Sequence, residues 1–201
     1  MPSLILDIIM QDWNSLTYNE KSEALQIAYS YYHANKYFGS QAQIPNLLTL
    51  INEYRLTSVL DYGCGSGHKE IWKSLKGMCP SLKTYQPYDP YSTEPEIRNY
   101  PPAGERFDLV SCTDVLEHLL IEDLEDVLTD LLYCTNKILY LTICLSAAGK
   151  MVVDAKGNNL YNQSLHTIVK PKDWWLAQIA KAERTVRDKQ TRSVPIKILW
   201  T

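Results

Sequence analysis

The chain has 201 residues, of which 45% are hydrophobic and 21% charged, and this composition excludes a disordered or fibrous protein. A chain of this length can form one domain with a sizeable buried core. Its formal net charge of −3 argues against a protein built around a long nucleic-acid footprint, because such proteins usually carry a surplus of basic residues.

The cysteines and the amino-terminal stretch favour a cytoplasmic protein. The cysteine count of five is odd and no pair has C-x-x-C spacing, so neither a disulfide framework nor a zinc site is expected. The opening segment MPSLILDIIMQDW lacks the basic region of a signal peptide and the length of a membrane span. We therefore expect a reducing, cytoplasmic environment and no membrane partner.

Two helices are predicted at the amino-terminal end, over residues 17–36 and 44–54. Apolar residues recur at helical spacing in the first segment. In the second, Pro45 stands where proline suits the first turn of a helix.

Strands and helices then alternate through the middle of the chain. The pattern predicts, in chain order, a strand at 57–63, a helix at 67–78, an extended segment at 83–89, a loop at 92–105, a strand at 106–112, a helix at 121–135, a strand at 137–145, a looser stretch at 146–163, a helix at 170–182 and two short strands within 184–200. The strands are apolar without alternation, which is typical of a parallel sheet covered on both faces. We predict an α/β fold with an open, mostly parallel, twisted sheet. It forms a single domain over 1–201, with 1–54 as a helical cap and 55–201 as the core.

The turn after the first strand holds three closely spaced glycines, in VLDYGCGSG at residues 59–67. Glycine lacks a Cβ atom, so the backbone at Gly63, Gly65 and Gly67 can approach a ligand closely and adopt positive φ. A strand-to-helix turn of an open α/β sheet lies at the edge where ligands bind, and the helix that follows adds free N–H groups. The alternative is a tight turn with a purely structural role.

Two nucleotide-binding patterns compete for this turn. A dinucleotide-binding G-x-G-x-x-G pattern places its third glycine where His68 stands, so a nicotinamide-dependent oxidoreductase is disfavoured. G-x-G-x-G preceded by Asp61 instead resembles the first motif of the Rossmann-like (class I) S-adenosylmethionine-dependent methyltransferases, of a small type also found in bacteriophages and marine bacteria. FDLVSCTDVLEHL resembles the fourth-strand motif of that family, and KILYLTI stands where its fifth strand is expected.

The resemblance covers residues 57–145 and implies a Rossmann-like fold with S-adenosyl-L-methionine as the cofactor. The residues that match the motifs are the expected cofactor contacts, and they are Asp61, Gly63, Cys64, Gly65, Asp89, Cys112, Thr113 and Asp114. Asp89 ends the next extended segment, where a carboxylate accepts hydrogen bonds from ribose hydroxyls; an aspartate of a simple turn is the alternative. The usual third strand is replaced by the proline-rich stretch 92–105, so the adenine contact is not identified.

The candidate catalytic residues are Asp114, His118 and His166. If the segment after the fourth strand is helical, Asp114 and His118 stack on one face with Glu117 beside them. His118 is either a general base or a polar anchor, and the anchor is favoured. His166 precedes the stretch KPKDWW and either binds or deprotonates the acceptor or is a hydrogen-bonded loop histidine.

Aromatic residues offer further candidates around the cleft. One of Trp174 and Trp175 is expected in the core, and the other lines the acceptor cavity. In the family that the sequence resembles, leading helices fold over the cofactor, so Tyr32, Tyr37 and Phe38 either cover the cleft or pack within the helix.

A metal-dependent variant is also considered. Asp114, Glu117, His118 and His166 resemble the two-carboxylate, two-histidine metal set of small-RNA 3′-terminal methyltransferases. Aspartate in place of the expected glutamate at position 114 and the acidic chain count against this set, so no metal is predicted.

The functional prediction is an S-adenosylmethionine-dependent methyltransferase that acts by in-line displacement on a small-molecule, sugar- or nucleotide-like acceptor. The alternatives are a metal-assisted RNA 3′-terminal ribose methyltransferase and a degenerate module that binds the cofactor without transfer. A small molecule is the expected partner, and a nucleic acid stays open.

Overall fold

A five-stranded parallel sheet forms the centre of the protein. The computed structural model describes residues 12–35, 41–189 and 193–201. The strand order in the sheet is β2-β1-β3-β4-β7, and each neighbouring pair is parallel. The strands are β1 (Ser58–Tyr62), β2 (Thr84–Tyr88), β3 (Phe107–Thr113), β4 (Thr135–Ile143) and β7 (Ile196–Trp200). The predicted α/β fold with a parallel sheet is therefore confirmed.

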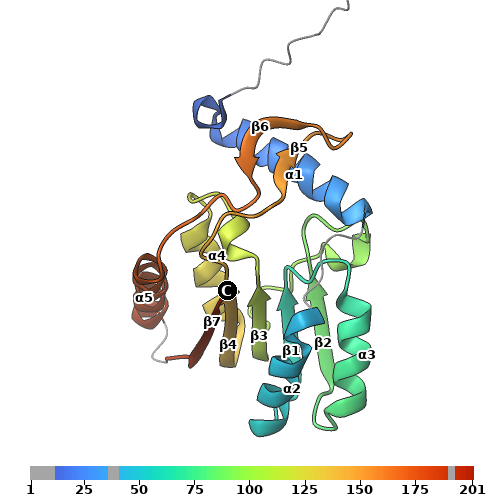
Figure 1. Cartoon of the computed structure of the whole chain (residues 1–201). Coiled ribbons are helices and arrows are strands. Elements are labelled where there is room, and N and C mark those ends of the chain that lie inside the picture. Colours follow the sequence, from blue (N-terminus) through green and yellow to red (C-terminus); the bar gives the residue numbers. More distant parts are fainter. Residues whose placement is uncertain (1–11, 36–40, 190–192) are drawn as a thin grey trace, which may run out of the picture.

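Helices cover both faces of this sheet (Figure 1). α2 (Ile44–Glu53) and α3 (His68–Met78) pack on one face, and α4 (Leu124–Cys134) and α5 (Lys172–Lys189) pack on the other. Successive strand residues point to opposite faces. Val59 therefore packs in the hydrophobic cluster under α2 and α3, and Leu60 packs in the cluster under α4 and α5. Burial on both faces explains why the strands read as unbroken apolar runs.

A third layer lies over the carboxyl-terminal edge of the sheet (Figure 1). It consists of α1 (Tyr18–Ala34) and an antiparallel hairpin of β5 (Met151–Val153) and β6 (Asn159–Ser164). The hydroxyl of Tyr32 donates to the carbonyl oxygen of Met151 over 3.0 Å, which joins the helix to the hairpin. The two segments share a separate hydrophobic cluster, and we call them the roof.

The helical amino-terminal segment divides between two places. α1 belongs to the roof, whereas α2 packs on the sheet through Leu47, Leu50 and Ile51. Pro45 stands in the first turn of α2, as expected. The boundary proposed between cap and core stays a prediction.

Two segments differ from the sequence prediction. The tail was expected to form two short strands, but α5 continues to Lys189 because Val186 extends the apolar stripe of Ile179 and Ala182 onto the sheet. Only β7 forms in this tail among the described residues. The looser stretch 146–163 contains β5 and most of β6. β5 is only three residues long and the residues of β6 are mostly polar and half-exposed, so neither strand gives an apolar pattern.

Residues 92–105 form a loop, as expected. Within them, the structure has no strand and one short 3-10 turn at Pro95–Ile97. Among the helices that the structure describes, none is long and apolar enough to span a membrane.

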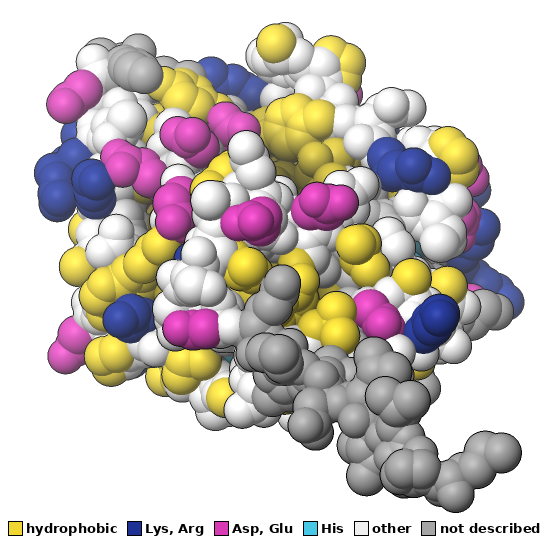
Figure 2. All heavy atoms as spheres, turned by 90° about the horizontal axis from the view of Figure 1, so that it is seen from above, with side chains coloured by type: hydrophobic (Ala, Val, Ile, Leu, Met, Phe, Trp, Pro, Cys, Tyr) yellow, Lys and Arg dark blue, Asp and Glu magenta, His cyan; other side chains and the backbone are white. Residues whose placement is uncertain are grey.

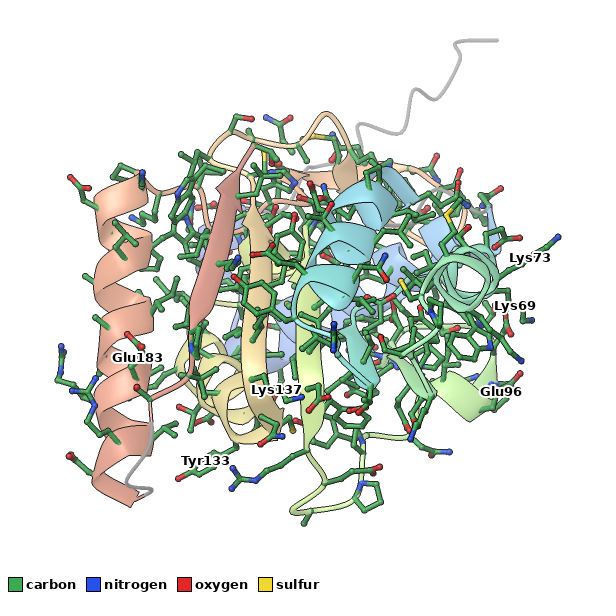
Figure 3. All side chains as sticks on the ribbon, turned by 90° about the horizontal axis from the view of Figure 1, so that it is seen from below. Lys69, Lys73, Glu96, Tyr133, Lys137 and Glu183 are labelled. Atoms are coloured by element: carbon green, nitrogen blue, oxygen red, sulfur yellow. The ribbon has the colours of Figure 1, made fainter. Side chains whose placement is uncertain are left out.

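A buried carboxylate joins the strands at the amino-terminal edge of the sheet, opposite the roof. Asp108 accepts hydrogen bonds from the backbone nitrogen and hydroxyl of Thr57, both over 2.9 Å, and from Lys137 Nζ over 3.0 Å. Asn136 donates a fourth hydrogen bond to Asp108 over 3.2 Å. Figure 3 views the molecule from below and labels Lys137. Burial alone would raise the pKa of Asp108, but the hydrogen bonds to the charged form outweigh it and lower that pKa.

We expect Asp108→Asn to lower the free energy of unfolding by about 1.5–3 kcal/mol at neutral pH, because charge-assisted hydrogen bonds are lost. The folded-state pKa lies below the unfolded value of about 3.9, so this contribution is complete above that value. It disappears as the pH falls through the folded-state pKa. Denaturant unfolding of both proteins between neutral pH and about pH 3 measures the difference.

The matched control is Asp188→Asn, because Asp188 is exposed on α5. Its stability should follow that of the unsubstituted protein at every pH. A loss for Asp108→Asn that stays constant down to pH 3 would show that charge is not the cause.

Candidate functional site

A cavity of about 880 Å³ lies between the carboxyl-terminal edge of the sheet and the roof. Its wall is built from the turns after β1, β2 and β3, one face of α1, the start of α4 and the segments 147–150 and 165–166. Figure 2 looks down on this side of the molecule and shows acidic side chains gathered on it. The predicted site residues on its wall are Gly63, Gly65, Asp89, Thr113, Asp114, His118 and His166.

The glycine turn after β1 has two residues with positive φ, Gly63 at 72° and Gly65 at 61°. A Cβ atom at Gly63 would lie 2.3 Å from Cγ2 of Val115, so no side chain fits there. Gly67 precedes α3 with φ of −91°, a conformation open to any residue. The three glycines therefore differ, and only the first two need the freedom that glycine provides.

Asp89 is fixed beside this turn at the cavity wall. Its Oδ2 accepts from the backbone nitrogen of Gly65 over 3.0 Å, and its Oδ1 accepts from that of Tyr91 over 2.9 Å. Nε2 of His33, from α1, lies 3.5 Å from Oδ2. Asp89 is thus a turn residue and a cavity residue together, and its Oδ1 has a second lone pair for a ligand.

Three of the expected cofactor contacts are buried away from the cavity wall. Asp61 accepts from the hydroxyls of Tyr85 over 2.6 Å and Ser111 over 2.9 Å, which links β1 to both neighbouring strands. Burial raises the pKa of Asp61 against the opposing effect of these hydrogen bonds. Cys64 and Cys112 are fully buried, and burial raises the pKa of both thiols. Their side chains support the turn from behind.

The segment after β3 is not the helical turn that the sequence suggested. Asp114 has a positive φ of 54°, and its Oδ1 accepts from the hydroxyl of Thr142 over 2.9 Å. The following turn, Leu116–His118, is a 3-10 helix. Asp114 and His118 therefore do not stack on one α-helical face, because the left-handed residue interrupts the helical path.

Glu117 is fully buried below the cavity wall. Its Oε1 accepts from the backbone nitrogen of Cys144 over 2.8 Å, and its Oε2 has no hydrogen-bond partner among the described residues. Burial raises the pKa of this carboxyl to about 7. The carbonyl oxygen of Glu117 also accepts from Ile168 over 3.0 Å, so this residue joins three segments.

His118 is a half-buried histidine on the cavity wall. Its Nδ1 lies 3.0 Å from the carbonyl oxygen of Leu165, and its ring stands edge-on to His166 with centroids 4.6 Å apart. Burial, and next the neighbouring His166, lower the pKa of His118 to about 3. An imidazole of such low basicity accepts a proton poorly at neutral pH, which favours the anchoring role.

His166 is one of three histidines on the cavity wall, with His33 and His118. Its Nδ1 lies 2.5 Å from the carbonyl oxygen of Ser146, an arrangement that requires a proton on Nδ1. Nε2 then carries the free lone pair. His166 can therefore offer a base or a ligand atom at the cavity.

The aromatic expectations are met only in part. Trp175 is fully buried in the core, but Trp174 packs against the same cluster and neither lines the cavity. Tyr32 is also buried, in the roof cluster and off the cavity wall. Tyr37 and Phe38 lie outside the described residues.

Several cavity residues were missed by sequence reasoning. Tyr29 of α1 lines the wall and stacks on Tyr91, with ring centroids 4.8 Å apart at 21°. Asp123, directly before α4, and Asp126 and Asp130, within it, line the cavity. Their spacing of three and four residues marks one helical face, which could have suggested a common wall.

The four residues considered as a metal set are not brought together as one group. Among the described residues, the potential ligand atoms that lie within 4.8 Å of one another belong to Glu117, Cys144 and His166. Asp114 and His118 are outside this group. Cys144 was not a sequence candidate because it lies far from the others in the chain.

The sequence matches a known protein family. A family model described as a methyltransferase domain matches residues 32–167, which include the glycine turn, Asp89 and all three histidines of the cavity wall. A search of curated proteins finds no match.

We expect Gly63→Ala to lower the free energy of unfolding by about 2–5 kcal/mol. About 1–2 kcal/mol arises from the positive φ and about 1–3 kcal/mol from overpacking against Val115. In the double variant Gly63→Ala/Val115→Ala, the part of the stability loss that arises from overpacking should disappear, and the part that arises from the positive φ should stay. Denaturant unfolding of both single variants and the double variant gives this coupling, and strictly additive losses would contradict the close approach.

Proposed function

Because the chain belongs to the family of Rossmann-like methyltransferase domains, we propose that it uses S-adenosylmethionine to methylate a small molecule. One observation carries the proposal: the glycine turn and the carboxylate of Asp89 border the same cavity. In an α/β sheet of this kind, ligands bind outside the carboxyl ends of the strands, which is where this cavity lies.

The residues present fit a sulfonium nucleoside. The cavity, about 880 Å³, is at the upper end of the range of roughly 300–1,000 Å³ that small-molecule sites occupy. Gly63 and Gly65 offer bare backbone, and Asp89 offers carboxylate lone pairs to ribose hydroxyls. Thr113 and Asp114 border the same space. When bound, S-adenosylmethionine supplies a methyl group made electrophilic by its positively charged sulfur.

The work of the protein is then mostly positioning. The backbone nitrogens of Gly65 and Tyr91 hold Asp89 in place before any ligand arrives, so little order is lost on binding. The roof lies over the cavity, with α1 on its wall, and so limits the access of water to the acceptor. Alignment of the acceptor atom with the methyl group supplies the larger share of the rate.

The charge of the wall supports a small acceptor over a nucleic acid. Asp123, Asp126 and Asp130 line the cavity together, and their carboxylates repel phosphate groups. Of the lysines that the structure describes, only Lys150 lines this wall. If the acceptor atom must lose a proton, His166 offers Nε2, whereas His118 is too weak a base.

The first test is calorimetric titration with S-adenosylhomocysteine and with NAD. We expect S-adenosylhomocysteine to bind and NAD not to bind. Asp89→Asn should weaken the binding of S-adenosylhomocysteine at least about tenfold, because charge-assisted hydrogen bonds of about 1.5–3 kcal/mol are lost.

Asp126→Asn serves as the matched control, since Asp126 lines the cavity from α4, away from the glycine turn. It should keep the affinity for S-adenosylhomocysteine within about twofold. Binding of NAD in place of S-adenosylhomocysteine, or equal losses in both variants, would overturn the assignment.

A further inference from the structure

Three side chains with metal-ligating atoms meet beside the cavity, although they are far apart in the sequence. Glu117 belongs to the 3-10 turn after β3, Cys144 directly follows β4, and His166 follows β6. One ligand atom from each lies within 4.8 Å of the others. Cys144 and His166 are on the cavity wall, and Glu117 is buried behind them.

The carboxylate of Glu117 has one satisfied and one unsatisfied oxygen. The backbone nitrogen of Cys144 donates a hydrogen bond to Oε1, which fixes the orientation of the carboxylate. Oε2 is buried and has no hydrogen-bond partner among the described residues. A buried carboxylate oxygen without a donor is costly, and a cation removes that cost.

His166 has the orientation of a metal ligand. Its Nδ1–H donates to the carbonyl oxygen of Ser146, which leaves the Nε2 lone pair available. Ligating histidines almost always donate their other ring N–H to a carbonyl or carboxylate in this way, which fixes the tautomer and the ring.

Cys144 supplies a sulfur to the same group. It is a free cysteine and is only half-buried, unlike the other four, which are buried. Its sulfur lies 3.3 Å from Oγ of Ser146 and 3.7 Å from the carbonyl oxygen of that residue. Ser146 therefore orients both Cys144 and His166.

We propose that Glu117, Cys144 and His166 bind a divalent transition-metal ion, for which zinc is the best match. A thiolate, an imidazole and a carboxylate are its preferred donors, and sites with three protein ligands keep a fourth position for water or substrate. Because Cys144 and His166 are on the cavity wall, a ligand in the cavity could take that position. The spacing of the cysteines gave no sign of this site, because it draws one ligand from each of three distant segments.

This site narrows the acceptor class, an extension that rests on the proposed function. A bound ion takes an acceptor hydroxyl or thiol as its fourth ligand and lowers its pKa, so that the proton leaves to solvent. The acceptor oxygen or sulfur then bonds to the methyl carbon while the carbon–sulfur bond of the donor breaks. The electron pair of that bond stays on the donor sulfur, which loses its positive charge.

The test uses Co²⁺ as a spectroscopic substitute for zinc. The purified chain is treated with a chelator, dialysed and titrated with Co²⁺ while absorption is recorded. We expect one equivalent to bind with a thiolate-to-cobalt charge-transfer band, which Cys144→Ser abolishes. Cys79→Ser is the matched control, since Cys79 belongs to the core cluster under α2 and α3 and should keep the band.

Two further variants probe the other ligands. Glu117→Gln keeps an oxygen for the Cys144 backbone nitrogen but loses the anionic ligand, and His166→Gln loses the imidazole. Each variant should bind zinc at least about tenfold more weakly, as measured by competition with a chromophoric chelator. Circular dichroism and melting temperature confirm that each variant is folded.

The proposal is overturned if the unsubstituted chain gives no saturable Co²⁺ band, if the band survives in Cys144→Ser, or if Glu117→Gln and His166→Gln leave the zinc affinity unchanged. Titration of the unsubstituted chain with S-adenosylhomocysteine in excess chelator separates this outcome from failure of the proposed function, because that measurement requires no metal.

Discussion

The site depends on a contact that leaves no room for a single methyl group. The turn after β1 and the turn after β3 meet where the backbone of Gly63 touches the side chain of Val115. Because parallel strands end at the same edge, two turns that are distant in the sequence can approach this closely. Asp89 follows β2 and Asp114 follows β3, so both lie at the same edge of the sheet as this contact. The absence of a side chain at Gly63 is what allows the two turns to meet.

Four buried carboxyls show how hydrogen-bond donors decide what an acid does in this fold. Asp108 has four donors and a lowered pKa, whereas Asp61 has two hydroxyl donors and a raised pKa. Glu117 has one donor on a single oxygen and a pKa of about 7. The first two therefore tie strands together. Asp89, held by backbone nitrogens at the cavity wall, and Glu117, with one bare oxygen, are the ones left to meet a ligand.

The sequence was most informative where function depends on local geometry. The glycine turn and Asp89 were recognisable because positive φ and a strand-ending carboxylate are properties of short segments. The arrangement of Asp114, Glu117 and His118 was not predicted, because helical spacing was assumed and the positive φ of Asp114 breaks that spacing. Cys144 joined the site only through tertiary structure. The hairpin was missed because β5 is only three residues long, and because β6 is polar and half-exposed and so carries no periodic signal.

The roof has a consequence for how such a protein can diverge. α1 and the hairpin pack around their own hydrophobic cluster, distinct from the two clusters that cover the faces of the sheet. Substitutions that reshape the roof therefore leave most of the folding energy of the sheet untouched. A lineage of such chains can therefore alter the part of the cavity wall that α1 provides while the sheet and its two covering layers stay constant. Evolution can in this sense vary the roof and the sheet separately.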